Sequence, residues 1–215
     1  MVYDLYVITD EKISGGRSHA EIVRQVIAGG ADVIQLRDKT RGYRELITIG
    51  RKIREITWKT GTMFIVNDRP DIALACCADG VHLGQEDLRV DVARQIAPLG
   101  FVIGVSVGSV KEAVQAEHDG ADYLALSPTF STSSKDDAGP GHGLVVLAAV
   151  CSRVTLPVVA IGGITCSNVG EVIDAGADGA AVISAVVGSP DITAAAREMK
   201  ELITRAKQRR AVYGR

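Results

Sequence analysis

Short apolar segments alternate along this chain with longer segments in which apolar residues recur every three or four positions. Four of the short segments contain an Ala-Asp pair: GGADVI (29–34), CCADGV (76–81), DGADYL (119–124) and AGADGA (175–180). Four others lack that signature: YVIT (6–9), MFIV (63–66), FVIGVSV (101–107) and PVVAIGG (157–163). Because short runs rich in Val, Ile and Ala are typical of buried parallel strands, the pattern predicts eight strands.

The segments between these strands have the periodicity of amphipathic helices. SHAEIVRQVIAGG (18–30) and SVKEAVQAEHDG (109–120) both open with a serine followed three residues later by a glutamate, which is the spacing of a capping box. Strand and helix therefore alternate eight times within 215 residues. This alternation predicts an α/β fold, a single-domain (β/α)8 TIM barrel over residues 1–215. An open, doubly wound sheet is the alternative, but the GxGxxG nucleotide motif expected after its first strand is absent.

Composition narrows the classes of partner. The chain is 47% hydrophobic with a net charge of −2, so it can bury one sizeable core and lacks the basic excess that favours nucleic acid. No apolar run reaches the roughly 18 residues of a membrane-spanning helix, and no cationic region precedes the first apolar segment. We therefore expect a cytoplasmic protein without nucleic-acid or membrane partners. The basic stretch KQRRAVYGR (207–215) is expected to be the solvated end of a helix.

The barrel sorts polar residues by position, because active sites lie at the carboxyl ends of the strands while the amino ends serve stability. The aspartates of the Ala-Asp signature precede their strands, so we interpret them as structural: Asp32, Asp79, Asp122 and Asp178. Another set follows its strands and is expected at the mouth of the barrel: Gln35, Arg37, Lys39, Asn67, Asp68, Asp87, Ser106, Lys135, Gly163 and Ser184.

The stretch VIQLRDK (33–39) places three polar residues on one face of a strand, because side chains two positions apart point the same way. Gln35, Arg37 and Lys39 share that face. In an isolated strand the face could simply be solvated, but this strand belongs to a barrel. Two cations and an amide at a barrel mouth indicate an anion-binding site.

Two carboxylates are expected beside those cations. Asp68 follows the third strand in IVNDRP, and Asp87 follows the fourth in HLGQEDL. Converging carboxylates repel each other unless a proton or a metal lies between them. Oxygen ligands without a matching His or Cys favour Mg²⁺ bound together with substrate phosphate oxygens. The alternative is that Asp68 caps the following helix and that Asp87 opens the next one.

A second phosphate site is expected across the mouth, because barrels often bind phosphate through backbone amides of the loops after strands 7 and 8. These strands end in AIGGI (160–164) and AVISA (181–185). The loop SPTFSTSSKDDAGPGHG (127–143) after the sixth strand is longer than most βα loops, which is typical of a lid. Its Thr132, Ser134 and Lys135 would supply hydroxyls to one phosphate and a cation to the other.

Taken in order, the motifs resemble those of the thiamine phosphate synthases over nearly the whole chain: LYVITD, GRSH, GGADVIQLRDK, NDR with DIA, DGVHLGQEDL, GVS, T-x-S-K-D, PVVAIGGI and VISA. That family joins 4-amino-2-methyl-5-pyrimidinylmethyl diphosphate to 4-methyl-5-(2-phosphoethyl)thiazole, or to its carboxylated form, and releases pyrophosphate. The resemblance implies a transferase of thiamine biosynthesis that uses Mg²⁺ and phosphorylated small molecules. It also implies that pyrophosphate leaves before the thiazole nitrogen captures the pyrimidine cation.

The resemblance further implies which residues bind each substrate. The pyrimidine diphosphate site would comprise Gln35, Leu36, Arg37, Asp38, Lys39, Asn67, Ser106 and Lys135, with catalysis assigned to Arg37, Lys39, Ser106 and Lys135. The metal ligands would be Asp68 and Asp87. The thiazole phosphate site would comprise Thr132, Ser133, Ser134, Gly163, Ile183 and Ser184. The chain departs from the family pattern at Ser127, which replaces a glycine, and at Ser131 and Ser134, which replace a proline and a threonine.

Two alternatives share this fold. A thiazole tautomerase is an isomerase with a similar barrel and a catalytic histidine in the loop after the sixth strand, where this chain has Pro128. The motifs QLRDK, NDR and QED, which belong to the pyrophosphate site, are all present here. The second alternative is a barrel that binds a thiamine precursor without catalysis. The sequence does not fix the oligomeric state, and a homo-oligomer is compatible with it.

Overall fold

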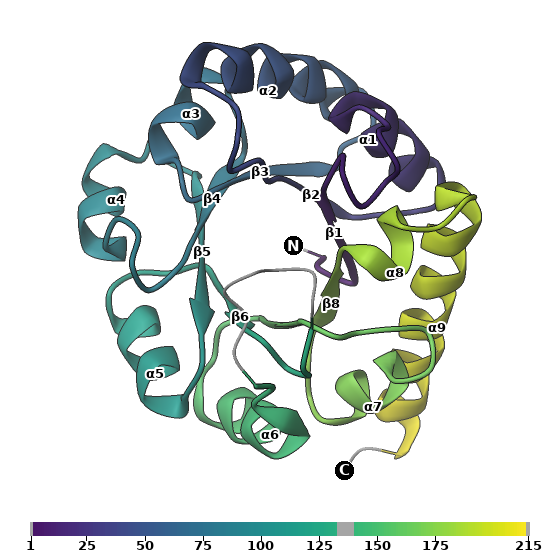
Figure 1. Ribbon diagram of the computed structural model, residues 1–215. Coiled ribbons are helices and arrows are strands. Elements are labelled where there is room, and N and C mark those ends of the chain that lie inside the picture. Colours follow the sequence, from purple (N-terminus) through teal and green to yellow (C-terminus); the bar gives the residue numbers. More distant parts are fainter. Residues whose placement is uncertain (1, 133–139, 214–215) are drawn as a thin grey trace.

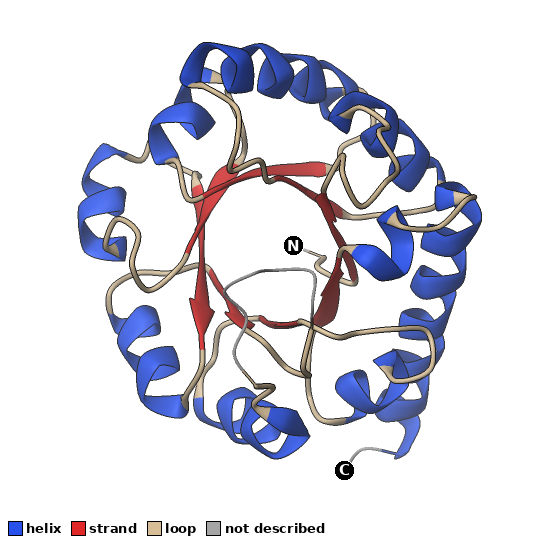
Figure 2. Cartoon of the chain, viewed as in Figure 1, coloured by secondary structure: helices blue, strands red, loops and turns tan. Residues whose placement is uncertain are grey.

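Eight parallel strands close into a barrel with helices around its outside (Figure 1) in the computed structural model, which describes residues 2–132 and 140–213. Each strand pairs with the next in sequence order, and the last pairs with the first. Figure 2 shows the strands as an inner ring and the helices as an outer layer. The predicted (β/α)8 TIM barrel is therefore confirmed.

The strands are β1 (Leu5–Thr9), β2 (Val33–Leu36), β3 (Met63–Asn67), β4 (Gly80–Leu83), β5 (Val102–Val107), β6 (Tyr123–Leu126), β7 (Val158–Ile161) and β8 (Gly179–Val182). The helices are α1 (His19–Ala28), α2 (Tyr43–Trp58), α3 (Pro70–Ala75), α4 (Val90–Ile96), α5 (Val110–His118), α6 (Gly143–Arg153), α7 (Val169–Asp174), α8 (Ser184–Val187) and α9 (Ile192–Tyr213). Among the described residues, no helix combines the length and apolar character needed to cross a membrane.

Inward-facing side chains fill the barrel toward the amino ends of its strands. They form an apolar cluster that includes Tyr6, Tyr123 and Ile161. Gly104 of β5 makes room for this filling, because a Cβ atom there would lie 2.0 Å from the ring of Tyr123. Tyr3, just before β1, packs on the same ring with 4.9 Å between ring centroids. The amino end of the barrel is thus closed by aromatic rings, which leaves the carboxyl end for a ligand.

The four repeat aspartates join neighbouring strands at the amino end of the barrel. Each carboxylate accepts a hydrogen bond from a backbone N–H of the preceding odd-numbered strand: Asp32 from Leu5 at 2.9 Å, Asp79 from Phe64 at 2.7 Å, Asp122 from Ile103 at 2.7 Å and Asp178 from Val158 at 2.9 Å. The backbone N–H of each aspartate donates to the carbonyl of that same residue. The prediction that these aspartates are structural is confirmed.

The basic stretch at 207–213 is the end of a helix, as expected, and Gln208, Arg209, Ala211 and Val212 are exposed, but two of its cations also make contacts with the barrel. Helix α9 continues to Tyr213, and Lys207 forms an ion pair with Asp4. Arg210 donates to the carbonyl oxygens of Ile173 and Ala177 at 2.8 and 2.9 Å. These contacts attach the end of α9 to the amino end of the barrel and to the turn before β8. Lys207 and Arg210 therefore have a structural role in addition to lying at a helix end.

Only one of the two predicted capping boxes forms. At α1, the Ser18 hydroxyl accepts a hydrogen bond from the Glu21 N–H, and the Glu21 carboxylate accepts one from the Ser18 N–H at 2.8 Å. At α5, Ser109 caps the Glu112 N–H, but the Glu112 carboxylate accepts from the backbone N–H of Gly108 at 2.8 Å. At α5 the glutamate therefore binds the residue before the N-cap and not the N-cap itself.

Candidate active site

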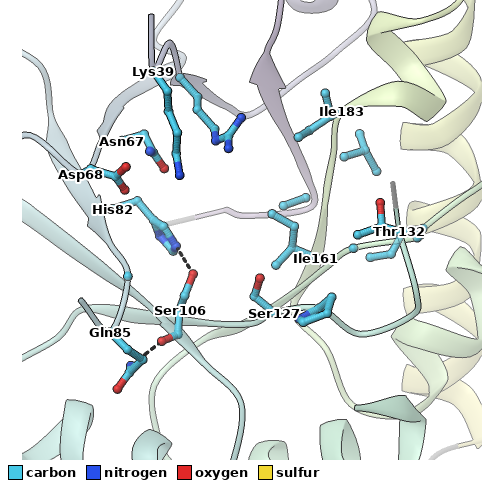
Figure 3. A pocket seen from close by; sticks show the side chains of 18 of the residues that line it. Lys39, Asn67, Asp68, His82, Gln85, Ser106, Ser127, Thr132, Ile161 and Ile183 are labelled. Carbon is cyan, nitrogen blue, oxygen red and sulfur yellow. Dashed lines mark hydrogen bonds between the residues drawn. The ribbon is translucent and has the colours of Figure 1, made fainter. Parts of the chain in front are cut away.

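A cavity of about 350 Å³ opens at the carboxyl ends of the strands (Figure 3). It is lined by ten of the predicted site residues: Arg37, Lys39, Asn67, Asp68, Asp87, Ser106, Thr132, Gly163, Ile183 and Ser184. Figure 3 shows Lys39, Asn67 and Asp68 on one side of the cavity and Ile161 and Ile183 on the other. The predicted Ser133, Ser134 and Lys135 lie outside the described residues, as does the rest of the segment 133–139 of the proposed lid. The cavity therefore has a polar half beside β2 to β5 and a more apolar half beside β7 and β8.

Three predicted residues of the VIQLRDK stretch do not line this cavity. Strand β2 ends at Leu36, whose buried side chain belongs to the core between the strands and the helices. Gln35 is 2% exposed, and its Nε2 donates to the Tyr6 hydroxyl inside the barrel. Asp38 is directed to neighbouring loops. Arg37 and Lys39 thus reach the cavity from a loop and not from a continued strand.

Asp38 anchors that loop. Its Oδ1 accepts from the Thr40 N–H at 2.8 Å, the Thr40 hydroxyl at 2.7 Å and the Arg41 N–H at 3.1 Å. Its Oδ2 lies 2.6 Å from Arg41 Nη1 and 3.3 Å from Nε2 of the buried His19. Burial opposes ionisation, but the bonds from Thr40, His19 and Arg41 outweigh it and hold the pKa of Asp38 well below its usual value. The ionised carboxylate fixes the turn that carries Arg37 and Lys39.

Asp68 and Asp87 form a strained acidic pair. Burial, and then the hydrogen bond and charge of Asp87, raise the pKa of Asp68 to about 6, although Lys39 and Arg37 act in the opposite direction. Asp68 adopts a left-handed backbone with φ of 62°, which is uncommon for a residue other than glycine. Its N–H donates to the His82 carbonyl at 2.8 Å, so β3 and β4 hold it in place.

Neither aspartate caps a helix. The N-cap residues of α3 and α4 are Arg69 and Arg89, and Asp87 Oδ2 instead accepts from the Gly84 N–H of its own loop at 2.6 Å. The alternative role of helix capping is therefore wrong for both.

The pair has the donor chemistry of a magnesium site. A carboxylate whose pKa is raised by burial and by a second carboxylate favours a cation between the two. No group of three His, Cys, Asp or Glu side chains suited to a metal occurs within residues 2–132 and 140–213. A metal held by Asp68 and Asp87 would complete its shell with substrate oxygens and water, which is the habit of Mg²⁺ and not of Zn²⁺. The residues present fit Mg²⁺.

A chain of hydrogen bonds runs from the barrel interior to the cavity. Gln35 Nε2 lies 2.7 Å from the Tyr6 hydroxyl, which lies 2.9 Å from the Tyr123 hydroxyl. The Tyr123 hydroxyl is 2.9 Å from His82 Nδ1, and His82 Nε2 is 2.9 Å from Ser106 Oγ. Figure 3 shows His82 directed at Ser106 across the cavity floor. His82 was not among the predicted site residues, although the alternation along the strand gives it the opposite face from Val81 and Leu83.

The two glycines after β7 allow the loop that follows β6 to pack closely against them. Gly162 and Gly163 have φ of 99° and 63°, and Cβ atoms there would lie 2.7 Å from Pro128 Cβ and 2.6 Å from the Ser131 carbonyl oxygen. Phe130 N–H donates to the Gly162 carbonyl at 3.0 Å. These glycines are thus required for packing of the loop after β6 beside the cavity, in addition to the predicted role in phosphate binding.

Comparisons with known proteins agree with the geometry. The family model described as thiamine monophosphate synthase matches residues 5–186. A thiamine-phosphate synthase of Methanoregula boonei is 66% identical over 97% of this chain and 96% of its own length. That of Methanoculleus marisnigri is 61% identical over 96% of this chain and 98% of its own. The solved structure of a thiamine phosphate pyrophosphorylase from Pyrococcus furiosus, 44% identical, superimposes with a TM-score of 0.88 over 95% of this chain and 96% of that one.

Proposed function

Since this chain belongs to the thiamine monophosphate synthase family and is a transferase that makes thiamine phosphate, we propose that the bond forms in the cavity at the carboxyl end of the barrel. The observation that carries this proposal is the acidic pair Asp68 and Asp87 beside the cations Arg37 and Lys39, all of which line that cavity. Such a set suits a pyrophosphate bound with a divalent cation.

The reaction starts with departure of pyrophosphate. The bond between the exocyclic methylene carbon and the pyrophosphate oxygen breaks, and its electron pair leaves with the oxygen. The amino group of the pyrimidine delocalises the positive charge left on the methylene. Arg37, Lys39 and the Ser106 hydroxyl face the region where negative charge grows, so their stabilisation is greatest in the transition state. No protein nucleophile is needed.

Asp68 and Asp87 would hold Mg²⁺, which this family uses in general and which would neutralise charge on the pyrophosphate. Burial and the neighbouring Asp87 raise the pKa of Asp68, and the same concentration of negative charge would attract a cation.

The second substrate occupies the opposite half. The thiazole ring lies against the apolar side chains beside β7 and β8, and its phosphate lies near Thr132, Gly163 and Ser184. The thiazole nitrogen then donates its lone pair to the methylene carbon, forming the C–N bond of thiamine phosphate. Ser133, Ser134 and Lys135 remain predicted contributors from the loop after β6.

Both substrates are phosphorylated small molecules, and such anions do not cross membranes unaided, so the cytoplasm is the compartment we propose for the reaction. Self-association remains a prediction that sedimentation of the purified chain would test.

A coupled assay tests the proposal. Purified protein given both substrates should release pyrophosphate and thiamine phosphate in equal amounts, and excess chelator should stop both. Conversion of a thiazole isomer without pyrophosphate release would favour the tautomerase alternative. That alternative has less support here because Pro128, at the position of its histidine, lines the cavity. Binding of either substrate with no product would favour the non-catalytic alternative.

A further inference from the structure

The hydrogen-bond chain from Gln35 to Ser106 has a direction that its donors determine. The Gln35 amide nitrogen can only donate, so the Tyr6 oxygen accepts. For the proton of Tyr6, the bonds shown in the described part of the chain offer one acceptor, the Tyr123 oxygen. Burial raises the pKa of both tyrosines, so both hydroxyls keep their protons. Tyr6 therefore donates to Tyr123, and the Tyr123 proton is directed at His82 Nδ1.

This direction selects one tautomer of His82. A neutral imidazole with Nδ1 as acceptor carries its proton on Nε2. That N–H then donates to Ser106 Oγ at 2.9 Å. The Ser106 hydroxyl proton, which is not used in this bond, remains available to the cavity that Ser106 lines.

The chain of hydrogen bonds with every donor and acceptor between Tyr6 and Ser106 exchanged is less favourable. With the proton on Nδ1, His82 would donate to Tyr123, Tyr123 would donate to Tyr6, and the Tyr6 oxygen would accept from both Tyr123 and Gln35. The Tyr6 proton would then be buried without an acceptor among the bonds shown, which is unfavourable at a side chain that is 2% exposed. The Ser106 hydroxyl would also donate to His82 and be lost to a substrate.

We propose that His82 is a positioning residue, held by the Gln35–Tyr6–Tyr123 chain as the Nε2–H tautomer, that makes the Ser106 hydroxyl a hydrogen-bond donor to the departing pyrophosphate. The proposal rests on the function assigned above to Ser106. His82 itself exchanges no proton with substrate and forms no covalent bond. Side chains of the barrel interior thus set the direction of one hydrogen bond in the active site.

Nitrogen NMR of the substrate-free protein tests the tautomer directly. Long-range ¹H–¹⁵N spectra should show a pyrrole-like Nε2 and a pyridine-like Nδ1 for His82, identified by the signals that disappear in His82→Asn. The exposed His118 provides the control, because His118→Asn should leave those signals unchanged. A pyrrole-like Nδ1 at His82, or an equal mixture of tautomers, would overturn the proposal. This result does not depend on activity, so it stands apart from any failure of the proposed function.

Kinetics test the consequence for Ser106. Tyr123→Phe removes only the hydroxyl, so the tautomers of His82 should become mixed and kcat should fall about fivefold to tenfold, less than for loss of a whole donor. Tyr43→Phe, which removes a hydroxyl from an exposed tyrosine, should leave kcat unchanged. In a Ser106→Ala background, Tyr123→Phe should have no further effect. Additive effects, or an unchanged kcat despite mixed tautomers, would show that the chain is only structural while the wild-type activity stands.

Discussion

The Asp38 carboxylate lies 2.6 Å from the Arg41 guanidinium, and this ion pair ties the loop that carries Arg37 and Lys39 to the body of the protein. Arg41 also pairs with Glu11 at 2.6 Å, and Glu11 accepts from the backbone N–H of His19. Asp38, for which the family resemblance implied substrate binding, is thereby placed to act through the loop.

Asp38→Asn should raise KM for the pyrimidine diphosphate about tenfold, because a loop displaced by a fraction of an ångström misaligns two cations. Arg41→Ala should have a similar effect, and the double variant should be no worse than either single one. Glu45→Gln is the matched control, since its pair with Arg41 at 2.8 Å is exposed and should change KM less than about twofold. Unchanged KM values in both loop variants would show that the anchor is dispensable.

Barrel architecture explains how much of the site could be predicted from sequence. Asn67 ends β3, Asp68 follows it directly, and Asp87 lies in the loop after β4. The carboxyl ends of these strands meet at one edge, so position in the unit was enough to bring the three residues together. The repeat aspartates were separable by the same rule, because they precede their strands.

Side-chain direction within a loop could not be predicted in the same way. Asp38 turns away from the cavity because Thr40 and Arg41 offer it backbone N–H groups, a choice made by local geometry. His82 was missed because its partners Ser106 and Tyr123 lie 24 and 41 positions further along the chain. A histidine inside a strand is also common in ordinary cores, so only the three-dimensional chain distinguishes it.

The acidic pair should destabilise the metal-free protein at neutral pH. The folded-state pKa of Asp68 is raised from 3.8 to about 6, so the folded state binds more protons than the unfolded chain between these values, and stability falls as pH rises through them. Two pKa units correspond to about 3 kcal/mol, which solvent screening at this half-buried pair reduces to about 1 kcal/mol.

Asp68→Asn removes that repulsion and keeps a residue that tolerates a left-handed backbone. In excess chelator, the variant should melt about 2 to 4 °C above the wild type at pH 7.5, with little difference near pH 4. Asp71→Asn serves as control, because the hydrogen bond from Arg69 lowers the pKa of Asp71 and its loss should stabilise nothing. An Asp68→Asn variant less stable than the wild type at pH 7.5 would contradict repulsion between Asp68 and Asp87.

The opposite end of the barrel should affect stability without affecting catalysis. Lys200 of α9 lies 2.8 Å from an Asp4 oxygen and 2.6 Å from an Asp32 oxygen, and all three side chains are mostly buried. Lys200→Met would leave two carboxylates short of a partner and should cost about 2 kcal/mol in urea unfolding, with kcat unchanged. Arg205→Met removes an exposed pair with Glu201 and should cost less than about 0.5 kcal/mol. Equal losses of unfolding free energy in the two variants would contradict a stabilising role for the Lys200 ion pairs.

Gly163→Ala tests the packing of the loop after β6. The added methyl group would lie 2.6 Å from the Ser131 carbonyl oxygen, on a backbone with φ of 63° that alanine adopts poorly. We expect Thr132 to shift with that loop and KM for the thiazole phosphate to rise about tenfold, with a smaller effect on the pyrimidine substrate. Gly42→Ala, where nothing lies within 4 Å of the new Cβ, should be neutral. An effect confined to the pyrimidine substrate would show that the two halves are assigned wrongly.

Arg37 should act on the departing pyrophosphate in the transition state as well as in the ground state. Its loop is fixed by Asp38, it lines the cavity, and its charge already opposes the rise in the pKa of Asp68. Leaving-group charge grows as the bond to the methylene breaks, so a preorganised cation gains most at that point. Arg37→Ala should therefore lower turnover, by about 3 to 4 kcal/mol or on the order of a hundredfold or more.

Arg37→Lys should recover only part of that loss, because lysine supplies charge without the planar, two-pronged donor geometry of a guanidinium. Arg89→Ala provides the control, since Arg89 is exposed and pairs with Asp91 outside the cavity. The measurement is single-turnover cleavage of the pyrimidine diphosphate at saturating substrate, where weaker binding no longer limits the rate. An Arg37→Ala protein with a normal single-turnover rate and only weaker binding would mean that the cation holds the substrate without taking part in departure of the leaving group.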